Sequence, residues 1–284
     1  WGQMGSIDNV NASNQFTLFG SHIGISNYDI NRSQGGAVAG YTPYRAGSLS
    51  TVWEFSETTN IGLDASFLQG KFDFSFNYFI NNTKDLIVGR QRNFHEAQVQ
   101  QPAINLGEMQ NKGFDANLTY RNQFGDLEVD ATLLVTAYTN EVKNIDGNDE
   151  SFFTRGAQRL SNVTRTDVGN PVSYFFGYEI DGFFNSQGEI DALNTASPNG
   201  TYQDGAVIGS WKYKDTNDDG EISDADQTYL GSPHPDFVTS INLDFRYKAF
   251  DMNMFFVWNQ GNEIYHSNKY FTDMRVFVGG VSDR

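Results

Sequence analysis

The chain has 284 residues, no cysteine, and a net charge of −16 from 19 basic and 35 acidic residues. The acidic balance argues against a nucleic-acid partner, because phosphate binding needs a basic surface. The lack of cysteine excludes disulfides, thiolate metal sites and cysteine nucleophiles. No run approaches the ~18 apolar residues of a transmembrane helix, whereas a β-barrel, with its weaker signal per strand, is not excluded.

The first 60 residues carry only a weak pattern. Phe16 and Leu18, then Ile23 and Ile25, predict short strands interrupted by glycine. From Trp53 onward the sequence predicts a strand longer than the ~9–11 residues that cross a bilayer. We therefore expect the regular part of the fold to begin near residue 53.

Residues 61–78 give the clearest signal, because apolar and polar residues alternate on both sides of a short turn at 69–71. A period of two is typical of a β-strand with one apolar and one polar face. The apolar positions are Ile61, Leu63, Ala65, Phe67, Phe72, Phe74, Phe76 and Tyr78, and the polar ones include Asp64, Ser66, Asp73, Ser75 and Asn77. The pattern predicts a β-hairpin.

The same alternation returns in two further hairpins. Residues 114–120 and 127–135 flank a turn predicted at 121–126, and residues 241–247 and 252–258 flank one at 248–250. The predicted apolar face includes Leu118, Leu133, Leu243 and Phe245, and the polar face includes Asp115, Asn117, Asp130, Thr132, Asp244 and Arg246.

The connections between hairpins, 81–112 and 137–236, are far longer than the turns inside them. Counting strands, every short turn falls at one end and every long connection at the other, which is typical of an outer-membrane β-barrel. We therefore predict an all-β fold, an antiparallel transmembrane β-barrel portion over 1–284, with 137–236 as a long extracellular loop region. A soluble sandwich also has alternating strands, but loops above about 15 residues are uncommon in compact domains.

Several stretches that contain these strands also carry a family signature. The segments NIGLD at 60–64, KDLI at 84–87 and NLGEMQNKGF at 105–114 resemble TonB-dependent outer-membrane receptors. More specific are WKYKDTNDDGEISDAD at 211–226, YLGSPHPDF at 229–237 and QGNEIY at 260–265. Together they resemble the SusC/RagA branch found in Bacteroidetes.

The resemblance implies a Gram-negative outer-membrane location and a large barrel that is closed inside by a plug domain and energised by TonB. It implies no enzymatic activity, but import of oligosaccharides or peptides together with a SusD-like surface lipoprotein. By the family's pattern, we expect a C-terminal barrel portion without the plug, the TonB box and the final strands. TonB would then act through the absent plug.

The segment 215–226 has the residue spacing of an EF-hand-type calcium loop. Oxygen-bearing side chains alternate, a glycine allows a sharp turn, and a backbone carbonyl adds a ligand. The predicted ligands of a structural calcium ion are Asp215, Asn217, Asp219, Glu221 and Asp226. The last position is Asp rather than Glu, which shortens its reach, and an Asx turn capping its own backbone is the alternative.

Aromatic clusters inside 137–236 are candidates for contact with substrate or partner, through Tyr174, Phe176 and Phe183. More often such residues pack a long loop onto itself. The four histidines (His22, His95, His234, His266) have no metal-ligand spacing, and no nucleophile elbow or phosphate loop occurs, so no catalytic residue is predicted. A secreted glycan hydrolase and a calcium-binding adhesion module, both with a β-sandwich fold, are the alternatives to a transporter.

Overall fold

The computed structural model describes residues 1–6, 10–21, 27–28, 38–89, 99, 102–145, 151–154 and 163–269. The predicted strand positions Ile23 and Ile25, together with His22 and His95, lie outside these residues. The chain divides into two compact units. We call residues 1–152, 167–169 and 241–255 the sheet unit, and residues 153–166, 170–240 and 256–284 the loop unit.

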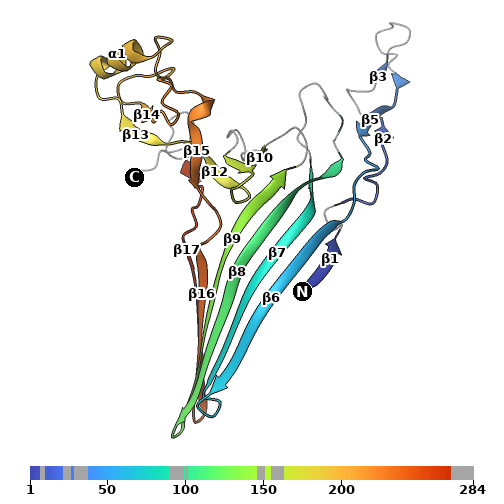
Figure 1. Cartoon of the computed structure of the whole chain (residues 1–284), viewed down its shortest axis with the longest axis vertical. Helices are drawn as coiled ribbons and strands as arrows, with labels where there is room; N and C mark the ends of the chain where they lie inside the picture. The colour runs from blue at the N-terminus through green and yellow to red at the C-terminus, as the bar shows by residue number, and fades with distance from the viewer. Residues whose placement is uncertain are drawn as a thin grey trace. The chain divides into compact units, whose positions relative to one another are not determined.

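The sheet unit is built on a seven-stranded sheet with the order β1-β6-β7-β8-β9-β16-β17 (Figure 1). Its strands are β1 (Gly2–Ser6), β6 (Glu54–Phe67), β7 (Phe72–Gly89), β8 (Ala103–Phe124), β9 (Leu127–Ile145), β16 (Phe237–Tyr247) and β17 (Phe250–Gln260). The pairings from β1 through β9 are antiparallel. Two short ladders, β2 (Leu18–Gly20) with β5 (Thr42–Arg45) and β3 (Asn27–Tyr28) with β4 (Val38–Ala39), precede the long strands.

The three predicted short turns lie together at one end of this sheet, at the bottom of Figure 1, which confirms that part of the prediction. Gln69 and Gly70 adopt positive φ of 58° and 81° in the β6–β7 turn, and Gly125 adopts 62° in the β8–β9 turn. Lys248 Nζ lies 3.6 Å from Asp126 Oδ2, so the β16–β17 turn neighbours the β8–β9 turn.

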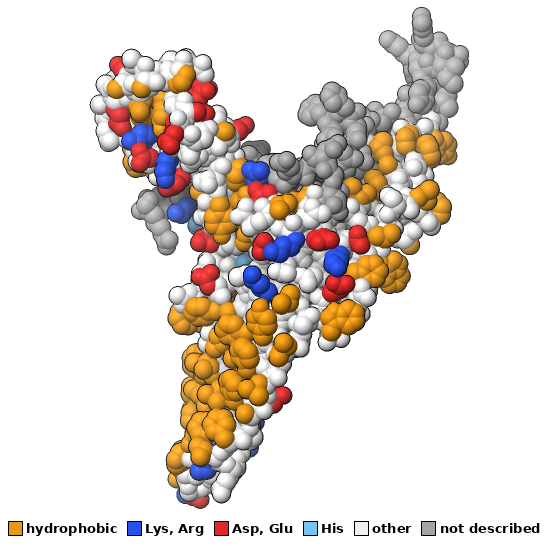
Figure 2. Space-filling model, in the orientation of Figure 1, with side chains coloured by type: hydrophobic (Ala, Val, Ile, Leu, Met, Phe, Trp, Pro, Cys, Tyr) orange, Lys and Arg blue, Asp and Glu red, His pale blue; other side chains and the backbone are white. Residues whose placement is uncertain are grey.

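The register confirms the predicted faces of the sheet. Directly opposed residues form apolar rows across four strands, such as Ala65–Phe74–Leu118–Leu133. Polar rows such as Ser66–Asp73–Thr119–Thr132 lie on the other face. Aromatic neighbours stack along the apolar face, with ring centroids 5.4 Å apart for Phe67–Phe72 and 5.8 Å for Phe76–Phe114. Figure 2 shows hydrophobic side chains gathered over the lower part of the sheet.

In the pairings from β6 through β9, the register shifts lie toward the end that carries the long connections. The β7–β8 register shifts between Thr83 and Leu86 and again before Ile87, and the β8–β9 register shifts between Glu108 and Met109. Within the first shift, Asp85 adopts a φ of 54°. The Asn105 side chain braces this region, since it accepts the Val52 N–H (2.8 Å) and donates to the Asp85 carbonyl (2.6 Å).

The strands are longer than predicted. The predicted turn 121–126 is wrong in extent, because Arg121, Asn122 and Gln123 continue β8 and pair with Asp130, Val129 and Glu128. Likewise β7 and β9 continue to residues 89 and 145, into the predicted connections. Polar side chains do not prevent backbone pairing, so alternation ends before the strands do.

Two small sheets and one α-helix lie wholly or mostly in the loop unit. Strands β10 (Ser151–Thr154), β11 (Thr164–Asp167), β12 (Tyr174–Tyr178) and β15 (Gln227–Gly231) form one sheet, and β13 (Ile180–Phe183) pairs with β14 (Trp211–Tyr213). Helix α1 (Gln187–Ala196) begins at Ser186, whose hydroxyl accepts the Glu189 N–H. The buried apolar side chains of the loop unit include Tyr174, Phe184 and Ile190.

Within the described part of the chain, the structure contains no helix with the length and apolar character needed to cross a membrane.

Candidate functional site

The acidic segment 215–226 connects β14 to β15 and binds its own backbone. Asp215 Oδ2 accepts the Gly220 N–H at 2.8 Å, in a turn where Gly220 has a φ of 85°. Asn217 Oδ1 accepts the Asp219 N–H at 3.0 Å, and Asp219 Oδ1 accepts the Glu221 N–H at 3.0 Å. These are the self-capping contacts that Asp and Asn make in turns.

Asp226 is fully buried, and its hydrogen bonds organise this segment. Its carboxylate accepts the backbone N–H of Thr216 at 2.9 Å and that of Ser223 at 2.8 Å. Burial alone would raise the pKa of Asp226. Backbone N–H donors from Ser223, Thr216 and Asn217 outweigh that effect and hold the pKa below its usual value. The ionised carboxylate thereby fixes both ends of the segment.

The structure does not bring the predicted calcium ligands together. Asp226 is occupied by N–H donors, and the Asn217 amide donates to Asp219 Oδ2 (2.8 Å). Asp215 Oδ1 is buried without a hydrogen-bond partner. In the described ranges no three His, Cys, Asp or Glu side chains cluster so that they could hold a metal. Side chain-to-backbone bonds therefore order this loop, and calcium binding stays a prediction.

The three predicted aromatic contact residues separate into two environments. Tyr174 is only 3% exposed, and its ring packs on Phe176 and Tyr229 with centroid distances of 6.2 and 5.1 Å. Arg165 covers the Phe176 ring at 4.7 Å. Both Tyr174 and Phe176 thus support the β11–β12–β15 sheet from inside the loop unit.

Phe183 alone among the three presents a large part of its ring to solvent. It is 47% exposed and stacks on Trp211, which is 48% exposed, with centroids 4.3 Å apart. The two residues are paired across β13 and β14. Trp211 was not predicted as a contact residue, because nothing local in the sequence shows that these two segments pair.

An ion-pair cluster lies beside this aromatic pair. Lys212 Nζ contacts Asp181 at 3.0 Å and Glu189 at 3.2 Å. The hydrogen bonds that Lys212 donates to these two carboxylates raise its pKa. The Asn185 N–H, followed by Lys212, lowers the pKa of Glu189. The cluster connects β13, β14 and α1, and its role is structural.

Two of the motifs behind the family resemblance, 229–237 and 260–265, are connected by two hydrogen bonds. Glu263 Oε2 accepts the Ser232 N–H at 2.7 Å, and the Glu263 N–H donates to the Ser232 carbonyl at 2.8 Å. The neighbouring Gly231 has a φ of 147°, and an added Cβ would lie 2.7 Å from the Glu263 side chain. Close approach of the segments 229–237 and 260–265 therefore requires glycine at this position.

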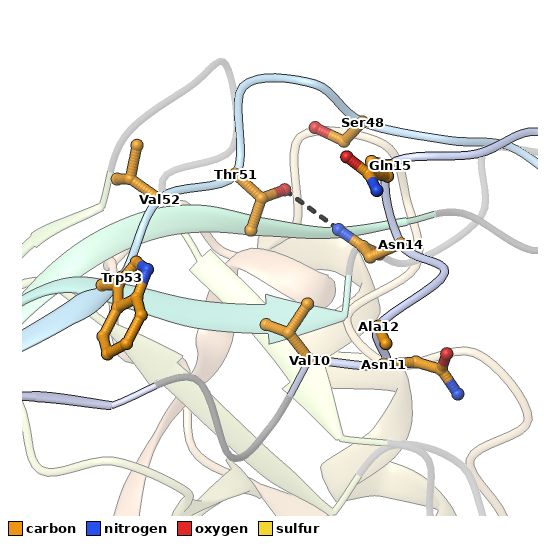
Figure 3. Close-up of a pocket in the computed structure, with 9 residues that line it drawn as sticks. All are labelled: Val10, Asn11, Ala12, Asn14, Gln15, Ser48, Thr51, Val52 and Trp53. Atoms are coloured by element: carbon orange, nitrogen blue, oxygen red, sulfur yellow. Dashed lines mark hydrogen bonds between the residues drawn. The ribbon is translucent and has the colours of Figure 1, made fainter.

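A pocket near the N-terminus of the sheet unit is also structural (Figure 3). Asn14 is 7% exposed there, and its amide donates to Thr51 Oγ1 and to the Ala103 carbonyl, both at 3.0 Å. Asn14 Oδ1 accepts the Ala103 N–H at 2.9 Å. This side chain is fully used in attaching the N-terminal segment to the start of β8.

The polar face of the sheet forms a hydrogen-bonded surface rather than a converging site. Asp73 pairs with Arg121, and Thr136 Oγ1 donates to Asp115 Oδ1 at 2.7 Å. On β16 and β17, Asn253 donates to Asp244 at 2.6 Å. Such a surface matches the polar interior of a large outer-membrane barrel.

Residues 9–256 match the family described as TonB dependent receptor-like, β-barrel. The chain therefore belongs to the TonB-dependent receptor-like β-barrel family and is located in the outer membrane. A TonB-dependent receptor of Formosa agariphila is 32% identical over 240 residues, covering 82% of this chain and 23% of the relative. The TonB-dependent receptor SusC of Bacteroides thetaiotaomicron is 25% identical over 226 residues, covering 76% of this chain and 21% of SusC.

Among solved structures, the RagAB peptide transporter matches with a TM-score of 0.71 at 18% identity, covering 95% of this chain and 27% of that chain. This likeness confirms the predicted fold. The chain spans about a quarter of the length of these relatives.

Proposed function

We propose that the protein containing this chain imports oligosaccharides or peptides across the outer membrane, together with a SusD-like surface lipoprotein. Family membership supports transport, and the likeness to SusC and to the RagAB peptide transporter favours these substrate classes. In this proposal energy comes from TonB through the plug domain that the family resemblance implies.

The observation that carries the proposal is the ordered module formed within the longest connection. Between β9 and β16 the chain builds two sheets, a helix and a capped acidic segment rather than a simple loop. In an outer-membrane barrel the long connections are extracellular. A folded extracellular module offers a surface on which a lipoprotein or a captured solute can rest.

Within that module, the Phe183–Trp211 pair is the contact surface we propose. Half-exposed stacked aromatic rings supply a large contact area with little loss of side-chain entropy. The same chemistry suits the apolar face of a sugar ring and the centre of a protein interface.

Growth and co-purification test this function. Deleting the parent gene should abolish growth on one complex glycan or peptide source and leave growth on its monomers intact. The double variant Phe183→Ala and Trp211→Ala should reduce both growth on that source and recovery of the lipoprotein with the barrel. Ile264→Ala removes another exposed apolar side chain of the loop unit and serves as the control. Normal growth of the deletion strain on every source, and a barrel purified without any lipoprotein, would contradict the proposal.

A further inference from the structure

The apolar face of the sheet has a well-defined upper limit. On β7 it runs from Phe72 to Ile80, and Ile80 is directly opposite Lys112 of β8. Nine residues at ~3.4 Å each, on strands tilted by about 35–45°, span roughly 20 Å, close to the ~25 Å apolar band of outer-membrane barrels. The outer boundary of the hydrocarbon therefore lies near Ile80 and Lys112.

A charged band follows immediately above this limit on the same face. The next row across the strands is Glu57–Asn82–Gln110–Glu141. Lys84 lies opposite Phe55 and contacts Glu57 at 2.9 Å, and Lys143 contacts Glu141 at 2.7 Å. Figure 2 shows charged side chains over the sheet, above its hydrophobic area.

The opposite face at the same level has a different chemistry. Its row is Thr58–Asn81–Asn111–Asn140, all of them neutral hydroxyls and amides. Asn140 donates to Asn111 at 2.7 Å, and Asn81 Oδ1 is buried without a hydrogen-bond partner, so no charged group enters this row. The lysines therefore lie on the face that meets lipid. Exposure to water above the membrane applies to both faces, so it does not by itself explain why the lysines occur on this one.

We propose that Lys84, Lys112 and Lys143 form a lysine collar that binds the phosphate groups of outer-leaflet lipids. From Ile80 to Lys84 is four residues, or about 10 Å of height on tilted strands, which is comparable to the thickness of one headgroup layer. The long lysine stems lie along apolar surface while the ammonium groups reach the headgroups.

The carboxylates beside the collar do not prevent this binding. The side chains of Lys84 and Lys143 remain 45% and 38% exposed in their ion pairs. An ammonium group has three N–H donors, so one donor to Glu57 or Glu141 leaves two for a phosphate oxygen. Exposed ion pairs are also weak, which allows the ammonium to be shared. The glutamates hold the lysines in position along the strand.

The test uses the full-length parent protein purified from its native membrane in a mild detergent. The variant replaces all three collar lysines by glutamine, and the control makes the same change at Lys214 and Lys269 of the loop unit. Lipid phosphorus bound per protein, checked by native mass spectrometry, should fall about threefold or more in the collar variant, given the attraction of each basic residue to an anionic surface. It should be unchanged in the control, and equal lipid phosphorus in both variants overturns the proposal.

Two further arms keep the result decisive. If the triple variant does not fold, the delipidated wild-type protein is titrated with a phosphate-bearing lipid and with a neutral glycolipid of the same chain length. Stronger thermal stabilisation by the phosphate-bearing lipid supports the collar, and equal stabilisation overturns it. Loss of bound lipid on chelation and in Glu57→Gln/Glu141→Gln, but not in the lysine variant, would instead assign the contact to bridging divalent cations and overturn the lysine proposal.

Discussion

Replacing Asp226 by alanine should unfold the 215–226 segment locally while the strands of the sheet unit stay intact. The fully buried carboxylate accepts N–H groups from Thr216 and Ser223 at 2.9 and 2.8 Å. Alanine leaves both donors without an acceptor, at about 1–3 kcal/mol each. We expect a local loss of about 2–6 kcal/mol, which corresponds to roughly 30- to 20,000-fold less protection from hydrogen exchange.

Hydrogen-exchange mass spectrometry on the parent protein measures this directly, in peptides covering 211–231. Asp226→Asn should have an intermediate effect, because it keeps one acceptor oxygen and loses the charge. Asp218→Asn, an exposed position in the same segment with a φ of 58°, is the charge-matched control. The lowered pKa of Asp226 means that its stabilisation is complete above the unfolded pKa and is lost as pH falls through the folded pKa. Protection in Asp226→Ala equal to that of Asp218→Asn would refute the reasoning.

Three further outcomes follow from the same structure. Phe74→Arg places a charge near the middle of the apolar face and should cost ~2–4 kcal/mol of barrel stability; Ser75→Arg, on the polar face of the same strand, should cost far less in a chemical unfolding titration. In intact cells, a cysteine introduced at Asn199 should react with a membrane-impermeant label, and one introduced at Asp126 should not; the reverse result would invert the topology. If calcium binds at 215–226, millimolar calcium should increase exchange protection there and Asp219→Ala should remove the increase, whereas equal protection in calcium and chelator removes the calcium assignment.

The sequence predicted the part of the fold in which each side chain faces one of two contrasting environments. Residues 61–78 alternate because one face meets lipid and the other is polar, so pattern and structure coincide there. Above the apolar band both faces of the sheet are polar, so apolar and polar residues no longer alternate. Strands β7 and β9 continue there, but the sequence carries no period that predicts them. At the other end Arg121 and Gln123 were mistaken for a turn for the same reason.

The candidate sites were harder to predict, because they depend on pairing and on side-chain direction. The spacing from Asp215 to Asp226 shows where oxygen atoms occur along the chain, but their orientation depends on which N–H groups lie nearest. The stacking of Phe183 on Trp211 depends on the pairing of β13 with β14, and helix α1 separates these two strands along the chain. No periodic signal encodes that pairing.

The irregularities in the strand ladder divide the sheet into two zones with different tolerance to changes in chain length. Through the apolar band the register runs without a shift, as it must where no water can satisfy an unpaired N–H or carbonyl. One inserted residue there would also turn every following side chain to the wrong face. The shifts near Thr83, Leu86 and Glu108 lie at or above the level of the lysine collar, where water is available. Evolution can therefore lengthen or shorten the extracellular ends of these strands, and so reshape what the protein presents to its surroundings, while the segment that fits the membrane keeps a constant length.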